Sequence, residues 1–268
     1  MIPDSVLATP ILGALLGDTI GSVHEWAKTK STDFALWSPK SRPTDDSVLT
    51  CATAEALLAG VAYDKAYRDW ARRYPNAGYG GAFRRWFASD DAGPYGSWGN
   101  GSAMRASPIG VAMTTVDDVL AEAERSAIVT HDHAEGIKGA QAAALAVFLA
   151  RTRVPKEDIR REIAARFGYD MVRTLDEIRP GYAFDVSCQG SVPEALLAFL
   201  ESNSTEQAIR LAISLGGDAD TQACIAGAAA AAWEGGVPDP LARELWRRLP
   251  DDMRDVVEAF AERYPVQG

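Results

Sequence analysis

Apolar positions recur at helical spacing along most of the chain, and alanine is abundant throughout. Few stretches alternate between apolar and polar residues over four or more positions, as half-buried strands would. We therefore expect an all-α fold, with irregular stretches at 76–105 and 180–189. The predicted helices are Ser5–Ile20, Val48–Ala59, Tyr63–Tyr74, Val116–Thr130, Glu135–Arg151, Lys156–Phe167, Asp170–Ile178, Val192–Glu201, Thr205–Leu215, Gln222–Trp233, 239–248 and 250–264.

The composition is that of an ordinary globular protein. No Pro- or Ser-rich linker and no run of like charges divides the chain, so we expect a single domain over residues 1–268. Of the 268 residues, 47% are hydrophobic, which is enough to bury a large core. The net charge of −10 argues against non-specific binding to nucleic acid or to anionic membranes, although a nucleotide-like ligand could still occupy a local pocket.

The sequence gives no sign of disulfides, zinc or a membrane segment. The three cysteines, Cys51, Cys188 and Cys224, are scattered and lack metal-ligand spacing. No segment reaches about 18 consecutive apolar residues, and the N-terminus shows no basic stretch followed by an apolar run. We expect a cytoplasmic protein that does not bind membranes.

An acidic turn precedes the most Ala-rich helix of the chain. Gly216 and Gly217 allow a sharp turn, and Asp218, Asp220 and Thr221 follow at the expected helix start. One such residue is usually a helix cap. Three oxygen-bearing side chains exceed what one cap uses, and a hard divalent cation would use the surplus.

A second acidic turn opens the predicted helix that begins at Val48. Thr44 is a candidate N-cap, and Asp45 and Asp46 are favourable acids for a first turn. Adjacent carboxylates repel each other unless a cation or a set of donors neutralises them. The two turns together offer six oxygen ligands, enough for two octahedral ions about 3.5–4 Å apart. Because neither turn contains His or Cys, we expect Mg²⁺ or Mn²⁺ rather than Zn²⁺.

The first predicted helix carries glycines four residues apart, at Gly13, Gly17 and Gly21, which indicates close packing of two helices. Asp18 lies inside this apolar stretch, so it must be paired, hydrogen-bonded or neutralised, and we interpret it as structural. Glu25 follows the last glycine and is free to point into a cleft.

Residues 76–105 combine many glycines with aromatic side chains. The segment from Gly96 to Arg105 contains backbone that can cradle phosphate oxygens, with aromatic rings nearby that can stack on a base. A Gly-rich surface loop is the alternative, and the segment is not a Walker motif. His131 and His133 flank an aspartate, an arrangement compatible with a metal ligand, a contact to a ligand hydroxyl or a helix cap.

Four segments in this order resemble the ADP-ribosylglycohydrolase family. They are Gly17-Asp18-Thr19-Ile20-Gly21 with Glu25, Thr44-Asp45-Asp46-Ser47, Gly99-Asn100-Gly101-Ser102-Ala103-Met104-Arg105, and Gly216-Gly217-Asp218-Ala219-Asp220-Thr221. The resemblance runs from about residue 10 to residue 235. It implies an orthogonal helix bundle with a metal-binding cleft at helix ends, a binuclear Mg²⁺ or Mn²⁺ centre, and hydrolysis of the glycosidic bond, N- or O-linked, between ADP-ribose and an acceptor.

The resemblance also assigns roles to single residues. It implies that Glu25 is the acid–base group, and that a metal-bound aspartate, Asp45 or Asp220, orients the attacking water. The implied metal ligands are Thr44, Asp45, Asp46, Asp218, Asp220 and Thr221. The implied contacts to ADP-ribose are Ser97, Trp98, Gly99, Asn100, Gly101, Ser102 and His131, with Trp98 placed to stack on adenine.

Two other functions stay open. The first is a protein that binds ADP-ribose without cleaving it, or a crystallin-like family member that has lost catalysis. The second is a metal-dependent phosphoesterase, which the absence of a Lys/Arg clamp disfavours. The sequence does not identify the acceptor: a modified protein, a polymer of ADP-ribose and a small molecule are all compatible with it, and although nucleic acid is not an expected partner, its ADP-ribosylated ends are not excluded.

Overall fold

The computed structural model describes residues 2–266, and its regular elements are all helices. Within these residues the only β-type pairing is an isolated bridge between Gly99 and Ser187, so the all-α prediction is confirmed. The elements are α1 (Asp4–Ala8), α2 (Pro10–Gly21), α3 (Asp45–Ala59), α4 (Tyr63–Arg73), α5 (Gly81–Ala88), the 3₁₀ helix η1 (Asn100–Ser102), α6 (Ser107–Ala112), α7 (Val116–Ala127), α8 (Ala134–Arg151), α9 (Lys156–Phe167), α10 (Leu175–Ile178), α11 (Cys188–Glu201), α12 (Thr205–Ile213), α13 (Ala219–Glu234), α14 (Asp239–Arg248) and α15 (Asp251–Arg263).

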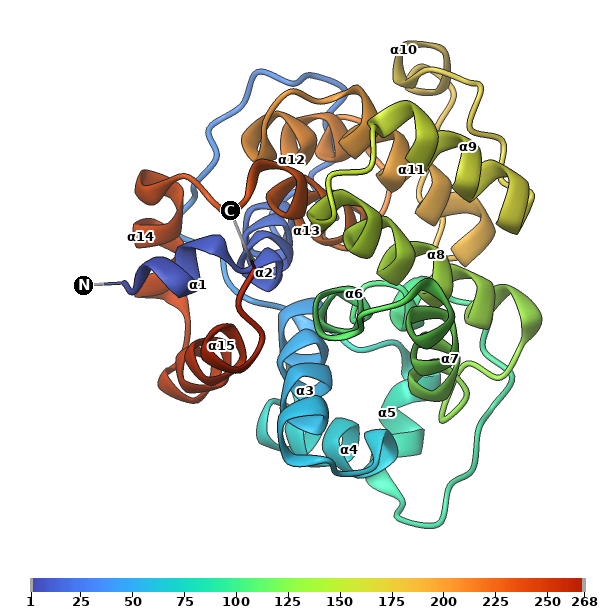
Figure 1. The fold of residues 1–268 in the computed structure, drawn as a ribbon, viewed down its shortest axis with the longest axis vertical. Coiled ribbons are helices and arrows are strands. Elements are labelled where there is room, and N and C mark those ends of the chain that lie inside the picture. Colours follow the sequence, from blue (N-terminus) through green and yellow to red (C-terminus); the bar gives the residue numbers. More distant parts are fainter. Residues whose placement is uncertain (1, 267–268) are drawn as a thin grey trace.

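Helices α2 and α13 form the centre of the fold and pack against each other without intervening side chains (Figure 1). A Cβ atom added to Gly17 would lie 2.0 Å from the carbonyl oxygen of Ala223, and one added to Gly13 would lie 2.4 Å from that of Gly227. The glycines of α2 therefore permit backbone contact, as the spacing indicates. The alanines of α13 keep its other faces close to α8, α11 and α12.

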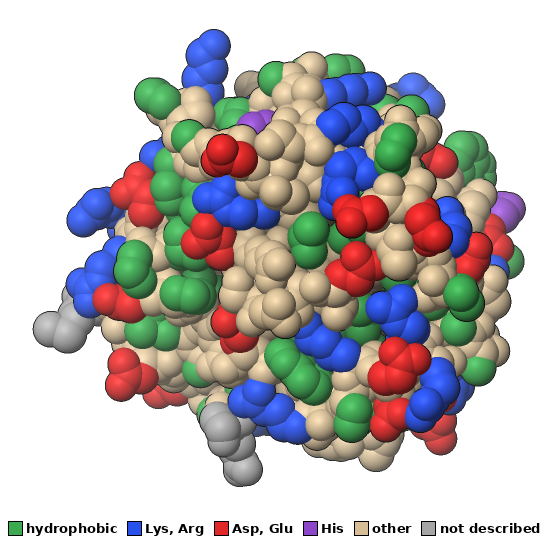
Figure 2. Space-filling model, turned by 90° about the horizontal axis from the view of Figure 1, so that it is seen from above, with side chains coloured by type: hydrophobic (Ala, Val, Ile, Leu, Met, Phe, Trp, Pro, Cys, Tyr) green, Lys and Arg blue, Asp and Glu red, His purple; other side chains and the backbone are tan. Residues whose placement is uncertain are grey.

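The remaining helices surround this pair. Helix α3 packs against α4 and α15, and α8 packs against α6 and α7. On the face shown in Figure 2, acidic and basic side chains are interspersed, and neither sign forms a continuous patch. No helix among residues 2–266 is long and apolar enough to cross a membrane.

The prediction of one long irregular stretch at 76–105 is wrong in part. Helix α5 occupies Gly81–Ala88 and buries Phe83, Trp86 and Phe87, which lie three and four residues apart. The surrounding glycines concealed this helical spacing, and the short η1 was concealed in the same way. Helix α6 was not predicted either, although Pro108 in its first turn is a typical helix-start signal.

Several predicted boundaries also differ, among them the starts of α3 and α13, which lie three residues earlier than predicted, and the end of α7, which lies three residues earlier. Three differences have a clear local cause. The stretch Ser5–Ile20 is broken at Thr9, because Pro10 begins a new helix. Of Asp170–Ile178 only Leu175–Ile178 is helical, since a capping box at Thr174 starts the helix there. Helix α11 begins at Cys188, four residues before the predicted start, because the side chain of Ser187 accepts a hydrogen bond from the Gly190 N–H.

Candidate functional site

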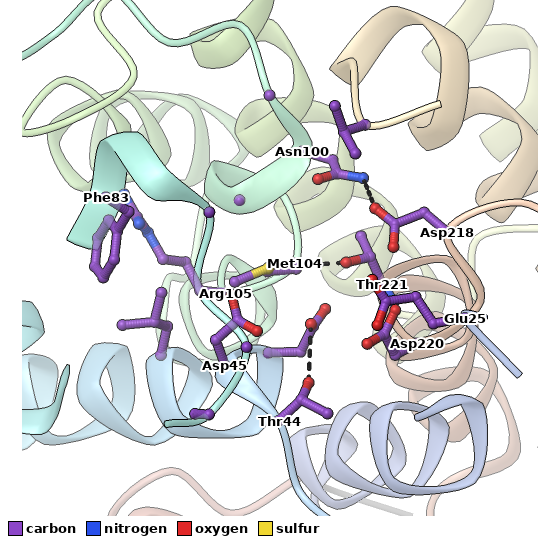
Figure 3. Close-up of a pocket in the computed structure, with 18 of the residues that line it drawn as sticks. Glu25, Thr44, Asp45, Phe83, Asn100, Met104, Arg105, Asp218, Asp220 and Thr221 are labelled. Carbon is purple, nitrogen blue, oxygen red and sulfur yellow. Dashed lines mark hydrogen bonds between the residues drawn. The ribbon is translucent and has the colours of Figure 1, made fainter. Parts of the chain in front are cut away.

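The N-terminal ends of α3, α5, η1 and α13 converge on a cavity of about 580 Å³ (Figure 3). The segment that follows α2 completes the wall with Glu25. Helix N-termini present unsatisfied N–H groups and a positive partial charge, so this is a favourable place for anions and acidic side chains.

The two acidic turns meet in this cavity. Carboxylate oxygens of Asp18, Asp46 and Asp220 lie within 4.8 Å of one another, and so do those of Glu25, Asp218 and Asp220. Asp220 belongs to both clusters, so residues from the α2, α3 and α13 ends form one continuous acidic surface. Figure 3 shows Glu25, Asp218 and Asp220 together on one side of the cavity and Asp45 on the other.

The remaining members of the predicted ligand set lie in the same place. Thr44, Asp45 and Thr221 all line the cavity. Asp45 belongs to neither cluster, and its carboxylate faces Gly78, where an added Cβ would lie 2.7 Å from Oδ1. Gly78 has a φ of +129°, so the glycine both fits its backbone conformation and leaves space for Asp45.

Asp18 holds the start of α3 in position. Its buried carboxylate accepts hydrogen bonds from the Thr44 N–H at 2.8 Å, the Thr44 hydroxyl at 2.5 Å and the Ser47 N–H at 3.0 Å, and a further one from the Ser47 hydroxyl. The Thr44 side chain makes no capping bond of its own, so Asp18 caps α3 from another helix. The structural interpretation of Asp18 is compatible with these bonds, but its place in an acidic cluster was not foreseen.

Burial raises the pKa of every acid in the two clusters, and repulsion by neighbouring carboxylates raises it further for Glu25, Asp46 and Asp220. Burial is the larger cause for Asp46 and Asp220, whose pKa values lie well above the usual range, and the neighbouring carboxylates add to it. The same two causes, burial first, raise the pKa of Asp45 to about 8 and raise that of Glu25. Burial also raises the pKa of Asp218, against the opposing effect of a hydrogen bond from Asn100.

The donor set fits a hard divalent cation. No ion pair within residues 2–266 reaches any of these carboxylates. One oxygen of Asp46, Oδ1, is buried without a hydrogen-bond partner among the described residues. A buried carboxylate oxygen without a donor is costly, and a cation removes that cost. Only oxygen ligands are available in the clusters, which suits Mg²⁺ or Mn²⁺.

Asn100 joins the Gly-rich segment to the acidic surface. Its side-chain amide donates to Asp218 Oδ2 at 2.7 Å and to the Ser191 hydroxyl at 3.2 Å, and its backbone N–H donates to the Val186 carbonyl at 2.8 Å. Ser97, Gly99 and Gly101 line the cavity beside it.

His131 lies behind the Gly-rich segment and also lines the cavity. An added Cβ at Gly101 would lie 3.2 Å from His131 Nε2, so the glycine lets the imidazole approach the backbone. Its Nδ1 lies 2.7 Å from the Thr130 hydroxyl, which also accepts a hydrogen bond from Arg105. Burial, together with the charge of Arg105, lowers the pKa of His131 well below its usual value, so the ring is neutral at pH 7.

Two of the expected ligand contacts do not line the cavity. Trp98 is 48% exposed, and its side chain is not part of the cavity wall, so stacking on a ligand inside the cavity is not supported by its position. Ser102 is fully buried, and its hydroxyl donates to the Gly136 carbonyl at 2.7 Å. The hydroxyl of Ser102 is thus used to join η1 to α8.

Sequence reasoning missed several residues of the wall. The first turn of α5 lines the cavity and lacks a side-chain cap, so its N–H groups are available to an anion. Trp26 and Phe184 lie at the mouth, with ring centroids 5.8 Å apart. The aromatic spacing of α5 was a usable signal, whereas nothing in the sequence relates Trp26 to a residue 158 positions away.

Comparisons with known proteins agree on one family. The sequence profile described as ADP-ribosylglycohydrolase matches residues 7–268. The protein ADP-ribosylhydrolase ARH3 of Mus musculus is 27% identical over 94% of this chain and 87% of its own length, and that of Homo sapiens is 28% identical over 84% of each chain. A solved structure named ADP-ribosylglycohydrolase-related protein complex superposes with a TM-score of 0.67 at 26% identity, covering 95% of this chain and 98% of the other.

Proposed function

The chain belongs to the ADP-ribosylglycohydrolase family, and on that premise we propose that it is a divalent-cation-dependent hydrolase that releases ADP-ribose from a modified acceptor. The observation that carries the proposal is the pair of carboxylate clusters sharing Asp220 at the floor of a cavity large enough for a nucleotide. Carboxylates in a cavity repel an anionic ligand unless cations neutralise them, and this supports the proposed cation requirement.

The residues that would hold two Mg²⁺ or Mn²⁺ ions are Thr44, Asp45, Asp46, Asp218, Asp220 and Thr221, with Asp18 supporting the first three. When bound, such ions supply positive charge that orients hydroxyl groups and water at the reacting carbon. Asn100 fixes the rotamer of Asp218 through its hydrogen bond, so that this ligand is oriented before substrate arrives.

Glu25 is the candidate general acid. Its carboxyl lies within the cluster formed with Asp218 and Asp220. The six ligands proposed above can hold the cations without it, so Glu25 is free for another role. Burial, together with the charge of Asp218, raises its pKa, which keeps a proton on it closer to neutral pH. A protonated carboxyl at this place can donate to the leaving atom as the glycosidic bond breaks, and an aspartate ionised by a bound cation, Asp45 or Asp220, would hold the attacking water.

The opposite wall of the cavity suits the ADP part of the substrate. The uncapped first turn of α5 offers N–H groups to phosphate oxygens, and Ser97 and Gly101 line the cavity beside it. The N–H groups of Gly99 and Asn100 are already donated to the Ser97 hydroxyl and the Val186 carbonyl. His131 is neutral and can exchange a hydrogen bond with a ribose hydroxyl. These roles would place the glycosidic carbon between the Gly-rich segment and Glu25.

The test is a panel of ADP-ribosylated substrates that differ only in the linkage, which includes arginine, serine, polymer, O-acetyl and nucleic-acid-end conjugates. We expect release of free ADP-ribose from at least one of them with Mg²⁺ or Mn²⁺ and none after exhaustive chelation by EDTA. Undiminished turnover in EDTA would exclude the cation requirement. Binding of ADP-ribose without any release would instead identify a catalytically inactive family member.

A further inference from the structure

Trp26 is an exposed aromatic residue directly beside the candidate acid. It is 79% exposed, although the cavity that contains Glu25 includes it in its wall. One face of its indole is occupied, because the ring lies parallel within 25° to that of Phe184, with the centroids 5.8 Å apart. Because Trp26 lies against a second aromatic ring at the edge of a cavity, the two form a contiguous apolar surface, which is typical of a binding site.

The position of Trp26 relates it to the leaving group, and this step rests on the proposed function. A general acid must approach the leaving atom to about 2.6–3.2 Å. The body of the acceptor then continues from that atom toward solvent, past the residues next to Glu25 on the open side of the cavity. Trp26 and Phe184 are the aromatic side chains that lie there.

Two cations border the same mouth. The ammonium group of Lys28 lies 5.5 Å from the ring centroid of Phe184. Arg42 is exposed and lines the cavity, and among the described residues its guanidinium donates only to the neighbouring Pro43 carbonyl, at 3.3 Å. In a chain with a net charge of −10, these cations provide local complementarity to acidic side chains of a partner.

We propose that Trp26 and Phe184 form an acceptor subsite that binds a polypeptide segment bearing the ADP-ribose group, with acidic residues beside the modified one. A free amino acid ends within a few atoms of the scissile bond and would not extend across the indole, whereas a peptide would. Two cations and a net acidic protein are a poor match for a polyanionic nucleic acid, which is bound through many phosphate contacts.

The experiment compares two substrates that share one linkage, chosen from those that the wild-type enzyme cleaves. The first is an ADP-ribosylated peptide with acidic residues on both sides, and the second is the same linkage on the free amino acid. An ADP-ribosylated oligonucleotide end is the third arm. The variants are Trp26→Ala, Trp26→Phe and the control Val172→Ala, which removes an 88% exposed side chain outside the cavity.

We expect Trp26→Ala to lower kcat/KM for the peptide about fivefold to tenfold more than for the free amino acid, the range that loss of one stacking contact produces. The effect should be mainly in KM, Trp26→Phe should restore part of it, and Val172→Ala should keep the wild-type ratio. The pH profile on the free amino acid should not move.

Three results would overturn the proposal. Equal losses on both substrates with a shifted pH profile would mean that Trp26 only positions Glu25, the residue that precedes it in the chain. A larger loss on the oligonucleotide would identify nucleic acid as the acceptor, and an unchanged ratio would mean that Trp26 contacts no acceptor. If the wild-type protein cleaves no linkage at all, the proposed function fails before this comparison begins.

Discussion

Removing divalent cations should make the stability of this protein fall as the pH rises from 5 to 8. The group concerned is the partly buried carboxylate of Asp45, whose pKa is raised from 3.8 to about 8 by loss of hydration and by the neighbouring charge of Asp18. Because the folded-state value lies above the unfolded one, the folded protein binds the proton more tightly. The stability that this proton contributes is complete below pH 3.8 and is lost progressively until the pH passes about 8.

The size of the effect follows from the same two values. They differ by about four pH units, since 8 minus 3.8 is 4.2. At about 1.4 kcal/mol for each unit, the upper limit is on the order of 6 kcal/mol, and most of it falls between pH 5 and pH 8. Even a third of that amount, about 2 kcal/mol, would lower Tm by about 4–8 °C in a chain of this size.

Thermal unfolding in EDTA and in Mg²⁺ at pH 5, 6, 7 and 8 measures this. A cation must displace the protons, so the increase in Tm on adding Mg²⁺ should be small at pH 5 and largest at pH 8. Asp45→Asn carries no charge, so in EDTA at pH 8 it should unfold above the wild type while losing most of the Mg²⁺ effect. Asp255→Asn changes an exposed acid of α15 and is the matched control. A wild-type Tm in EDTA that is the same at pH 5 and pH 8, with an Mg²⁺ increment independent of pH, would refute the reasoning.

Further predictions concern the acid, a supporting amide and the core. Glu25→Gln should lower kcat at least about 100-fold while calorimetry still detects ADP-ribose binding, and kcat of the wild type should decline as the pH rises through the raised pKa of Glu25, a limb that the variant lacks. Asn100→Ala removes a donor to Asp218, so titration with Mg²⁺ should give an affinity about 10-fold weaker, and an unchanged affinity would contradict the orienting role. Gly17→Ala would place a methyl group 2.0 Å from a carbonyl oxygen of α13 and should destabilise the protein by about 1–3 kcal/mol in a urea titration, whereas Gly93→Ala, which meets nothing within 4 Å, should match the wild type.

Much of the fold could be predicted from the sequence, because most of its helices are long and their apolar residues recur at helical spacing. The Ala-rich α13 and the glycine spacing of α2 predicted two buried helices that pack closely, and this is the central pair. The helix within 76–105 was not predicted. The many glycines there suggested a loop, although Phe83, Trp86 and Phe87 lie three and four residues apart, as on one face of a helix. Local cap chemistry, as at Thr174, fixed other boundaries that hydrophobic periodicity alone does not locate.

The candidate site was predicted from charge chemistry and not from geometry. Two acidic turns that repel within themselves indicated a shared cation site, and the structure places Asp46 and Asp220 in one cluster. The sequence did not show that Asp18 would cap α3 across the fold and join the same cluster. Nor did it show the outward position of Trp98, because a stacking role needs a direction in space and a residue type gives none.

The backbone contact between α2 and α13 fixes the distance between the two parts of the site that these helices carry. Asp18 lies near the end of one helix and Asp220 at the start of the other, and an added Cβ at Gly21 would lie 2.5 Å from the Cα of Asp220. No side chain separates the two helices there, so none can be trimmed or enlarged to adjust the spacing between these carboxylates. Evolution toward an ion of different radius would therefore have to proceed through the segments carrying Glu25 and residues 44–46, whose positions depend on side chains.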